Sequence, residues 1–205
     1  MIISALMPTT GVNDMSFPER IETSRLILRP YVLDDLDAHV EVLSNWDVVQ
    51  WLSNNVPIPY RREDGENSIR EAIQKFQDGQ SIQYAIEDKE TGRHVGGVRL
   101  FTITAETEVG YWMHPDFWGK GLGTEVLKAA ISAGFDEGTI VRFVAQTAEK
   151  NYGSQAILKK VGFVDGGAVP AEYYRDGHQE GGCTAFFTLD KADWLTQNAT
   201  QEKVT

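Results

Sequence analysis

One segment in the middle of the chain constrains the fold more than any other. The pattern of Thr107–Met113 predicts a β-strand, and apolar residues recur at helical spacing over Gly121–Phe135. A loop connects this strand to this helix, and its last part has glycine at alternate positions, 119, 121 and 123. The chain therefore contains a strand that leads through a glycine-rich loop into a helix.

Such a loop has a physical preference for anions. The first amides of a helix have no intrahelical acceptor, and together with the helix dipole they attract negative charge. Glycines remove side-chain obstruction, so that a phosphate can approach the main chain. Three glycines at a helix start are also consistent with a turn that only caps the helix, and the glycines alone do not separate these interpretations.

Two well-known phosphate loops do not match this segment. The P-loop requires Gly-Lys-Ser or Gly-Lys-Thr, whereas the chain has Gly-Lys-Gly. The dinucleotide-binding fingerprint requires Gly-x-Gly-x-x-Gly and an acidic residue about 20 positions later. Ala145, Gln146 and Thr147 stand where that acid is expected. A nucleotide-dependent oxidoreductase is therefore disfavoured.

The remaining patterns predict one domain that combines a mixed sheet with helices, an α/β (α+β) fold. Residues 1–18 show no periodicity and are expected to be a flexible lead-in, residues 19–198 form the domain, and residues 199–205 form a tail. Seven strands are predicted, over residues 25–29, 80–88, 95–102, 107–113, 141–147, 163–169 and 183–189. Helices are predicted around residues 33–43, 46–52, 69–79, 121–135 and 151–161.

Composition narrows the class of partner. The chain has 19 basic and 30 acidic residues and a net charge of −11, which disfavours nucleic acid and anionic membranes as partners. Its single cysteine, Cys183, permits no intramolecular disulfide and is expected to be a small buried thiol. His39 and His94 have no second ligand at metal spacing, so no metal is expected. Without a signal peptide or membrane span, a cytoplasmic location is expected.

The loop Trp118-Gly119-Lys120-Gly121-Leu122-Gly123 resembles the pyrophosphate loop of the GNAT superfamily, the acetyl-CoA-dependent N-acetyltransferases. Trp118 replaces the usual Arg or Gln, which is similar to the RimJ/RimL-like branch of ribosomal-protein Nα-acetyltransferases. Three further segments agree with that branch: residues 22–29, 151–154 and 160–163. The matching segments lie in order, and the resemblance covers more than three quarters of the chain.

The resemblance implies a mostly antiparallel sheet of about seven strands, with a splay between strands 4 and 5 that admits acetyl-CoA as co-substrate. It implies that the pantetheine pairs with the main chain of residues 112–114, that an amide near Met113 polarises the thioester, and that the pyrophosphate lies on residues 119–124. The cofactor-binding residues implied are Trp112, Met113, His114, Trp118, Gly119, Lys120, Gly121, Leu122, Gly123, Thr124, Asn151 and Ser154.

Two residues are expected to be catalytic. Glu108 is the expected general base, ahead of Glu106 and His114. Ser154 is expected near the thioester sulfur, and Asn151 is expected to bond the pantetheine. The alternative for this pair is that Asn151 only caps a helix and Ser154 is an exposed first-turn residue. Tyr152 is a reserve acid.

The acceptor side is less defined. Residues 46–80 cover it in such folds, and Tyr173, Tyr174, Asp176 and His178 of a late hairpin are candidates for its opposite wall. Aromatic residues could line an acceptor pocket, but packing roles are favoured for them: Trp46, Trp51, Tyr60, Tyr84 and Phe101.

The function expected from the resemblance is acetyl transfer to a primary amine, either a protein N-terminus or a small amine, by direct attack in a ternary complex. An inactive CoA-binding sensor is the alternative. By analogy, the protein is expected to be a monomer or homodimer.

Overall fold

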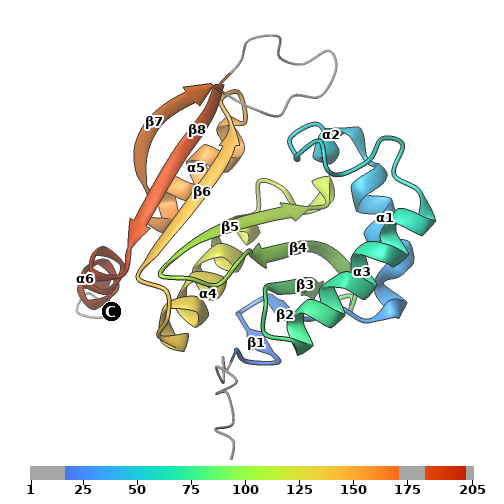
Figure 1. The fold of residues 1–205 in the computed structure, drawn as a ribbon, viewed down its shortest axis with the longest axis horizontal. Coiled ribbons are helices and arrows are strands. Elements are labelled where there is room, and N and C mark those ends of the chain that lie inside the picture. Colours follow the sequence, from blue (N-terminus) through green and yellow to red (C-terminus); the bar gives the residue numbers. More distant parts are fainter. Residues whose placement is uncertain (1–16, 171–182, 202–205) are drawn as a thin grey trace, which may run out of the picture.

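A computed structural model describes residues 17–170 and 183–201, which form an eight-stranded sheet with helices on both faces (Figure 1). The strand order is β1-β2-β3-β4-β5-β6-β8-β7. The strands are β1 (Ile21–Glu22), β2 (Leu26–Pro30), β3 (Ile82–Asp88), β4 (His94–Leu100), β5 (Glu106–Met113), β6 (Arg142–Ala148), β7 (Val164–Pro170) and β8 (Cys183–Asp190). The helices are α1 (Leu36–Ser44), α2 (Trp46–Val49), α3 (Arg62–Gln77), α4 (Leu122–Glu137), α5 (Tyr152–Val161) and α6 (Lys191–Gln201), with 3-10 turns η1 (Leu33–Asp35) and η2 (Pro115–Phe117).

The sheet consists of two antiparallel parts that meet at a short parallel contact. Strands β1 to β5 pair antiparallel, as do β6, β8 and β7. Strands β5 and β6 pair parallel over three positions only, from Glu106 opposite Arg142 to Glu108 opposite Val144. Beyond these residues the two strands diverge, as Figure 1 shows. The predicted mixed, mostly antiparallel sheet is confirmed. The predicted splay between the fourth and fifth strands is also confirmed, and these strands are β5 and β6 of the structure.

Helices cover both faces of the sheet. Successive side chains along each strand point to opposite faces, so each face receives every second residue. Helix α4 lies behind the sheet in Figure 1, where its Val126, Leu127 and Ile131 are fully buried in the main core. Helices α1 and α3 form a second buried cluster on the opposite face, which includes Leu36 and Ile69. These two helices cross closely at Gly65, where a β-carbon would lie 2.6 Å from Val40 Cγ2.

Both ends of the described chain differ from the sequence prediction. Phe17 is buried in the main core and the Pro18 carbonyl accepts a 2.6 Å hydrogen bond from Tyr84 Oη, so the domain begins inside the predicted lead-in. At the other end, α6 extends through residues 199–201, which were assigned to the tail. It attaches through Trp194, whose ring lies 6.4 Å from that of Phe135. Strand β1 and helix α6 were not predicted. A strand of two residues and a helix with few apolar residues show too little hydrophobic periodicity to be detected in the sequence.

Two smaller differences concern exposure and length. Cys183 is the first residue of β8 and is only partly buried, because it lies at the strand end. Helix α3 begins at Arg62, about two turns before its first predicted apolar residue. None of the helices in the described ranges is long and apolar enough to cross a lipid bilayer.

Two buried histidines lie between α1 and the sheet. His39 is fully buried and His94 is 4% exposed, and their rings are 5.7 Å apart. Burial lowers the pKa of His39 to about 3, with repulsion from His94 acting in the same direction. Burial also lowers the pKa of His94 to about 4, against the attraction of Asp35. Both rings are therefore neutral in the folded protein at neutral pH.

We expect the free energy of unfolding to decrease as the pH falls below about 6.5. The unfolded chain then binds protons that the folded chain does not. Each histidine therefore lowers the free energy of unfolding by up to about 1.4 kcal/mol for each unit by which the pH falls, until the pKa of that histidine in the folded protein is reached. Urea denaturation at intervals between pH 7.5 and 5 measures this slope. The variant with His39→Gln and His94→Gln should be nearly independent of pH in this window, and an equal slope in both proteins would refute the assignment.

Candidate active site

Among the described residues, the edge of β5 that faces the splay has no strand paired to it beyond Glu108. The amide of Phe101 donates to the Glu108 carbonyl at 3.0 Å, and the amide of His114 donates to the Val95 carbonyl at 2.8 Å. In an antiparallel ladder, alternate residues direct their main-chain groups to the same neighbour. Residues 108, 110, 112 and 114 therefore face β4, whereas residues 109, 111 and 113 face the opening between β5 and β6.

This alternation refines the predicted pantetheine edge. Of the three residues expected there, Met113 directs its main chain into the opening, whereas Trp112 and His114 direct theirs toward β4. Tyr111 joins Met113 on the open edge. The Met113 carbonyl already accepts a 2.8 Å hydrogen bond from Trp118 Nε1, so Trp118 stabilises the end of the strand. The free edge can accept an extended ligand with amide groups, as an added strand would bind.

His114 shapes the turn after β5. Its Nδ1 accepts a 3.2 Å hydrogen bond from the amide of Asp116 and thereby caps η2. Its Nε2 lies 3.7 Å from a carboxylate oxygen of Glu41 on α1. These contacts hold the imidazole at the loop, away from the bottom of the opening.

The glycine loop ends at an uncapped helix. Gly119 and Gly121 have φ values of 73° and 78°, the left-handed region that favours glycine, and Gly121 is the N-cap of α4 without a side-chain capping bond. The first-turn amides of α4 are thus available to an anion. Gly123 has a different role: a β-carbon there would lie 2.8 Å from Ile157 Cδ1, so glycine permits the close contact between α4 and α5.

An ion pair that sequence patterns did not reveal holds this loop in place. Arg25 Nη1 donates to the Lys120 carbonyl at 2.9 Å, and Arg25 Nη2 lies 2.6 Å from Glu125 Oε2. The same carboxylate accepts hydrogen bonds from Ser24 Oγ and from the amide of Arg25. Burial alone raises the pKa of Glu125, but hydrogen bonds with Thr23, Arg25 and Ser24 outweigh it and lower the pKa to about 2. The start of β2 is therefore tied to the first turn of α4.

A pair of hydroxyl groups spans the opening. Asn151 Oδ1 accepts a 3.1 Å hydrogen bond from the amide of Ser154, so Asn151 caps α5, as its alternative interpretation predicted. Ser154 Oγ lies 3.2 Å from Tyr111 Oη on β5, and either group can donate. Burial raises the pKa of Tyr111 to about 12, which keeps the phenol protonated at neutral pH. Tyr152, the reserve acid, is 73% exposed.

Glu108 lies at the bottom of the opening. It is the last residue of β5 in register with β6, opposite Val144. Its side chain shares a sheet face with Trp112, whose ring lies 6.4 Å from that of His39 on α1. Burial raises the pKa of Glu108, and the charge of Arg99 acts against this shift. Glu106 instead is exposed and lies 3.6 Å from Arg142, which makes it the weaker candidate.

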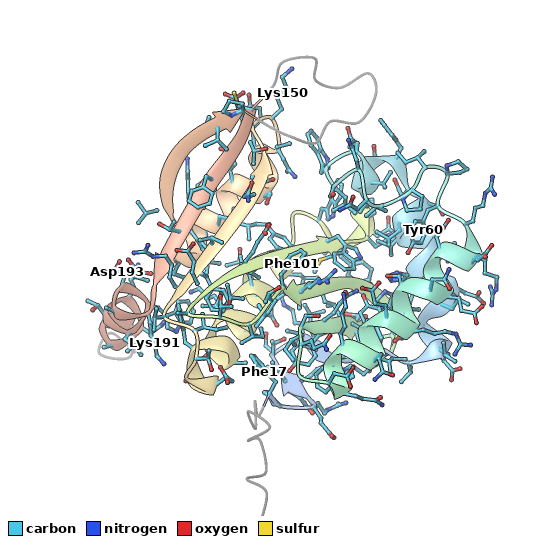
Figure 2. All side chains as sticks on the ribbon, in the orientation of Figure 1. Phe17, Tyr60, Phe101, Lys150, Lys191 and Asp193 are labelled. Atoms are coloured by element: carbon cyan, nitrogen blue, oxygen red, sulfur yellow. The ribbon has the colours of Figure 1, made fainter. Side chains whose placement is uncertain are left out.

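The aromatic residues divide between the core and the surface. Tyr60 and Tyr84 are buried, and Tyr60 Oη lies 3.3 Å from His39 Nε2. Trp46 is 45% exposed and Trp51 is partly buried. Phe101 lies on the connection between β4 and β5 (Figure 2) and remains partly exposed.

The late-hairpin candidates Tyr173, Tyr174, Asp176 and His178 lie outside the described residues. Within residues 17–170 and 183–201, no three His, Cys, Asp or Glu side chains come together as metal ligands.

Comparison with known proteins agrees with this geometry. The family profile described as "Acetyltransferase (GNAT) domain" matches residues 25–164. The uncharacterized N-acetyltransferase YoaA of Bacillus subtilis (strain 168) is 28% identical over 162 residues, which cover 77% of this chain and 89% of YoaA.

Solved structures share the fold. The ribosomal-protein-S5-alanine acetyltransferase of Vibrio fischeri aligns with a TM-score of 0.74 and 18% identity, over 85% of this chain and 98% of its own. RimL, a ribosomal L7/L12 alpha-N-protein acetyltransferase solved with coenzyme A, aligns with a TM-score of 0.73 and 21% identity, over 84% of this chain and 98% of its own. With the family profile matched over most of the domain, the chain belongs to the GNAT family of acetyltransferases, which use acetyl-CoA as co-substrate.

Proposed function

We propose that the protein transfers the acetyl group of acetyl-CoA to a primary amine by direct attack in a ternary complex. The observation that carries this proposal is the opening between β5 and β6, which has a free strand edge on one side and the uncapped start of α4 at its end. A strand edge suits the amide groups of pantetheine, and a helix start suits the pyrophosphate.

The proposed binding mode assigns the loop to the pyrophosphate and the β5 edge to the pantetheine. The amides of residues 119–124 receive the pyrophosphate, with Lys120 near it. The main chain of Tyr111 and Met113 pairs with the pantetheine, because these two residues face the opening. The Met113 amide is the donor proposed to polarise the thioester carbonyl, since the Met113 carbonyl is held by Trp118.

In the proposed reaction the amine nitrogen attacks the thioester carbon, forming a C–N bond as the C–S bond breaks. Glu108 accepts the proton that the amine loses, directly or through water. A carboxylate whose pKa is raised by burial is a stronger base than an exposed one. The departing thiolate takes a proton from the Ser154–Tyr111 pair, whose hydroxyls are 3.2 Å apart. The products are the acetylated amine and the CoA thiol.

We propose a protein N-terminus as the acceptor class, with small amines as the alternative. Several proteins of this fold are described as ribosomal-protein acetyltransferases, which supports a peptide acceptor. A net charge of −11 also favours a cationic amine approaching the protein. If no amine in a screen of peptides, polyamines and amino acids is acetylated while CoA still binds, the protein is a CoA-binding sensor instead.

Replacing the base should affect turnover and not cofactor affinity. We expect Glu108→Gln to lower kcat by about 100-fold, because the amide preserves the shape but cannot accept the proton. CoA affinity from calorimetry should remain within a factor of two or so of the wild type. Glu106→Gln is the matched control on the same strand and should keep full activity. Full activity in Glu108→Gln would remove Glu108 from the mechanism.

The two hydroxyls should act as one unit. We expect Ser154→Ala and Tyr111→Phe each to lower kcat about tenfold, and the double variant to lose little more than either single variant, because the groups are coupled. Steady-state thiol release measures this cycle. Tyr152→Phe, at an exposed position of the same helix, is the control. Fully additive losses would show that the two side chains act independently.

Cofactor binding should depend on the conformation of the glycine loop. We expect Gly121→Ala to weaken CoA binding at least about tenfold, because the methyl group obstructs the main chain and disfavours the left-handed conformation. Gly138→Ala is the matched control: Gly138 also has a positive φ, of 104°, with open space around its α-carbon, but it ends α4. It should lower the melting temperature and leave CoA affinity unchanged. Equal CoA affinities in both variants would refute the site.

A further inference from the structure

Arg99 on β4 is a partly buried cation that forms no ion pair among the described residues, and its charge lowers the pKa of the nearby Glu71 and acts against the raised pKa of Glu108. Among the described residues the other partly buried arginine, Arg29, bonds both Asp35 and Glu87. Within residues 17–170 and 183–201, Arg99 has no ion pair, and its buried Nε atom has no hydrogen-bond partner. An unpaired cation at such a place is unfavourable unless something else compensates its charge.

Phe101 provides part of that compensation. The guanidinium carbon of Arg99 lies 4.6 Å from the centroid of the Phe101 ring, a cation–π contact. A guanidinium stacked on a ring keeps the donors at its edge available for a planar, bidentate anion. The contact thus holds Arg99 in a geometry suited to a carboxylate or a phosphate.

Arg99 and Phe101 line a hollow of about 460 Å³ at the end of α3. Its other polar walls are Lys75, Gln80, Ser81 and Thr102. Glu71, the acidic residue nearby on α3, bonds Lys75. The hollow therefore combines Arg99, which has no ion pair, with the Lys75–Glu71 pair and neutral donors, in a chain whose overall charge is strongly negative.

Arg99, in the wall of this hollow, lies near the proposed catalytic base. Arg99 is in register with Gly110 and Phe101 is bonded to Glu108, so Arg99 and Glu108 are diagonal neighbours on one face of the sheet. Diagonal positions of this kind are about 7–8 Å apart. Gly110 lies between them without a side chain; a β-carbon there would lie 3.2 Å from Phe101 Cε2. The Phe101 ring therefore covers Gly110, and the charge of Arg99 still reaches Glu108, where it acts against the rise in pKa that burial causes.

We propose that Arg99 is the anion-binding residue of the acceptor site, and that preferred acceptors are primary amines that carry a carboxylate or phosphate group a few bonds from the nitrogen. This inference rests on the proposed acetyl transfer at Glu108. The amine lies at Glu108 while the anionic group binds Arg99, so one molecule spans both positions. The charge of Arg99 offsets the repulsion that a chain of net charge −11 exerts on such a group.

Matched peptides test the preference. The acceptors are the peptide amides Ala-Asp, Ala-Asn and Ala-phosphoserine, which share an N-terminus and differ in side-chain charge. We expect the wild type to acetylate Ala-Asp or Ala-phosphoserine with a kcat/KM at least about tenfold above that of Ala-Asn. Whichever acid is preferred identifies the anion as carboxylate or phosphate.

Variants assign the preference to Arg99. Arg99→Gln should reduce the acid-to-amide ratio to about one, and Arg99→Lys, which keeps the charge without the fork, should give an intermediate ratio. Arg61→Gln is the control, because Arg61 is exposed and does not line the hollow. A ratio near one in the wild type, or an unchanged ratio in Arg99→Gln and Arg99→Lys, would overturn the inference.

Binding measurements separate this inference from the proposed function. Calorimetry of the same peptides with CoA-saturated protein requires no chemistry. If no peptide is acetylated but the acidic ones bind more tightly and lose that advantage in Arg99→Gln, the anion site stands and acetyl transfer fails. If peptides are acetylated without dependence on Arg99, acetyl transfer stands and the anion site fails. If neither turnover nor preference is seen, both fail.

Discussion

The end of the pairing between β5 and β6 determines most of what this protein can do. The two strands share three register positions, and beyond Glu108 and Val144 each follows its own half of the sheet. A strand edge left unpaired inside a protein exposes main-chain donors and acceptors that need partners. Here the open edge of β5 leads to the uncapped start of α4, and the proposed binding of acetyl-CoA rests on this arrangement.

The elements around the opening are held by contacts between distant parts of the chain. The Arg25–Glu125 ion pair fixes the glycine loop to β2, and the Tyr111–Ser154 hydrogen bond joins β5 to α5 across the gap. Both contacts use groups whose protonation the fold stabilises: the pKa of Glu125 is lowered to about 2 and that of Tyr111 is raised to about 12. Glu125 is therefore ionised and Tyr111 protonated at neutral pH.

Local patterns predicted seven of the eight strands and the glycine loop, because strand alternation and glycine spacing lie within a few residues of each other, whereas the splay was predicted from the resemblance to the GNAT superfamily. The partner of Arg25 lies 100 residues away and that of Tyr111 lies 43 away, so no local pattern could identify either contact. The contact that also requires glycine at position 123, with Ile157, could not be predicted from the loop sequence. The direction of each β5 amide depends on the register with β4, which the sequence does not state.

Hydrogen exchange by NMR, followed residue by residue, tests the central claim most directly, namely that the opening is the acetyl-CoA site. In the free protein the amides of Tyr111 and Met113 should exchange quickly, whereas those of Trp112 and His114 should be protected by β4. Adding acetyl-CoA should slow exchange at Tyr111, Met113 and the first turn of α4. If acetyl-CoA binds while these amides exchange as before, the ligand occupies another part of the protein and the account is wrong.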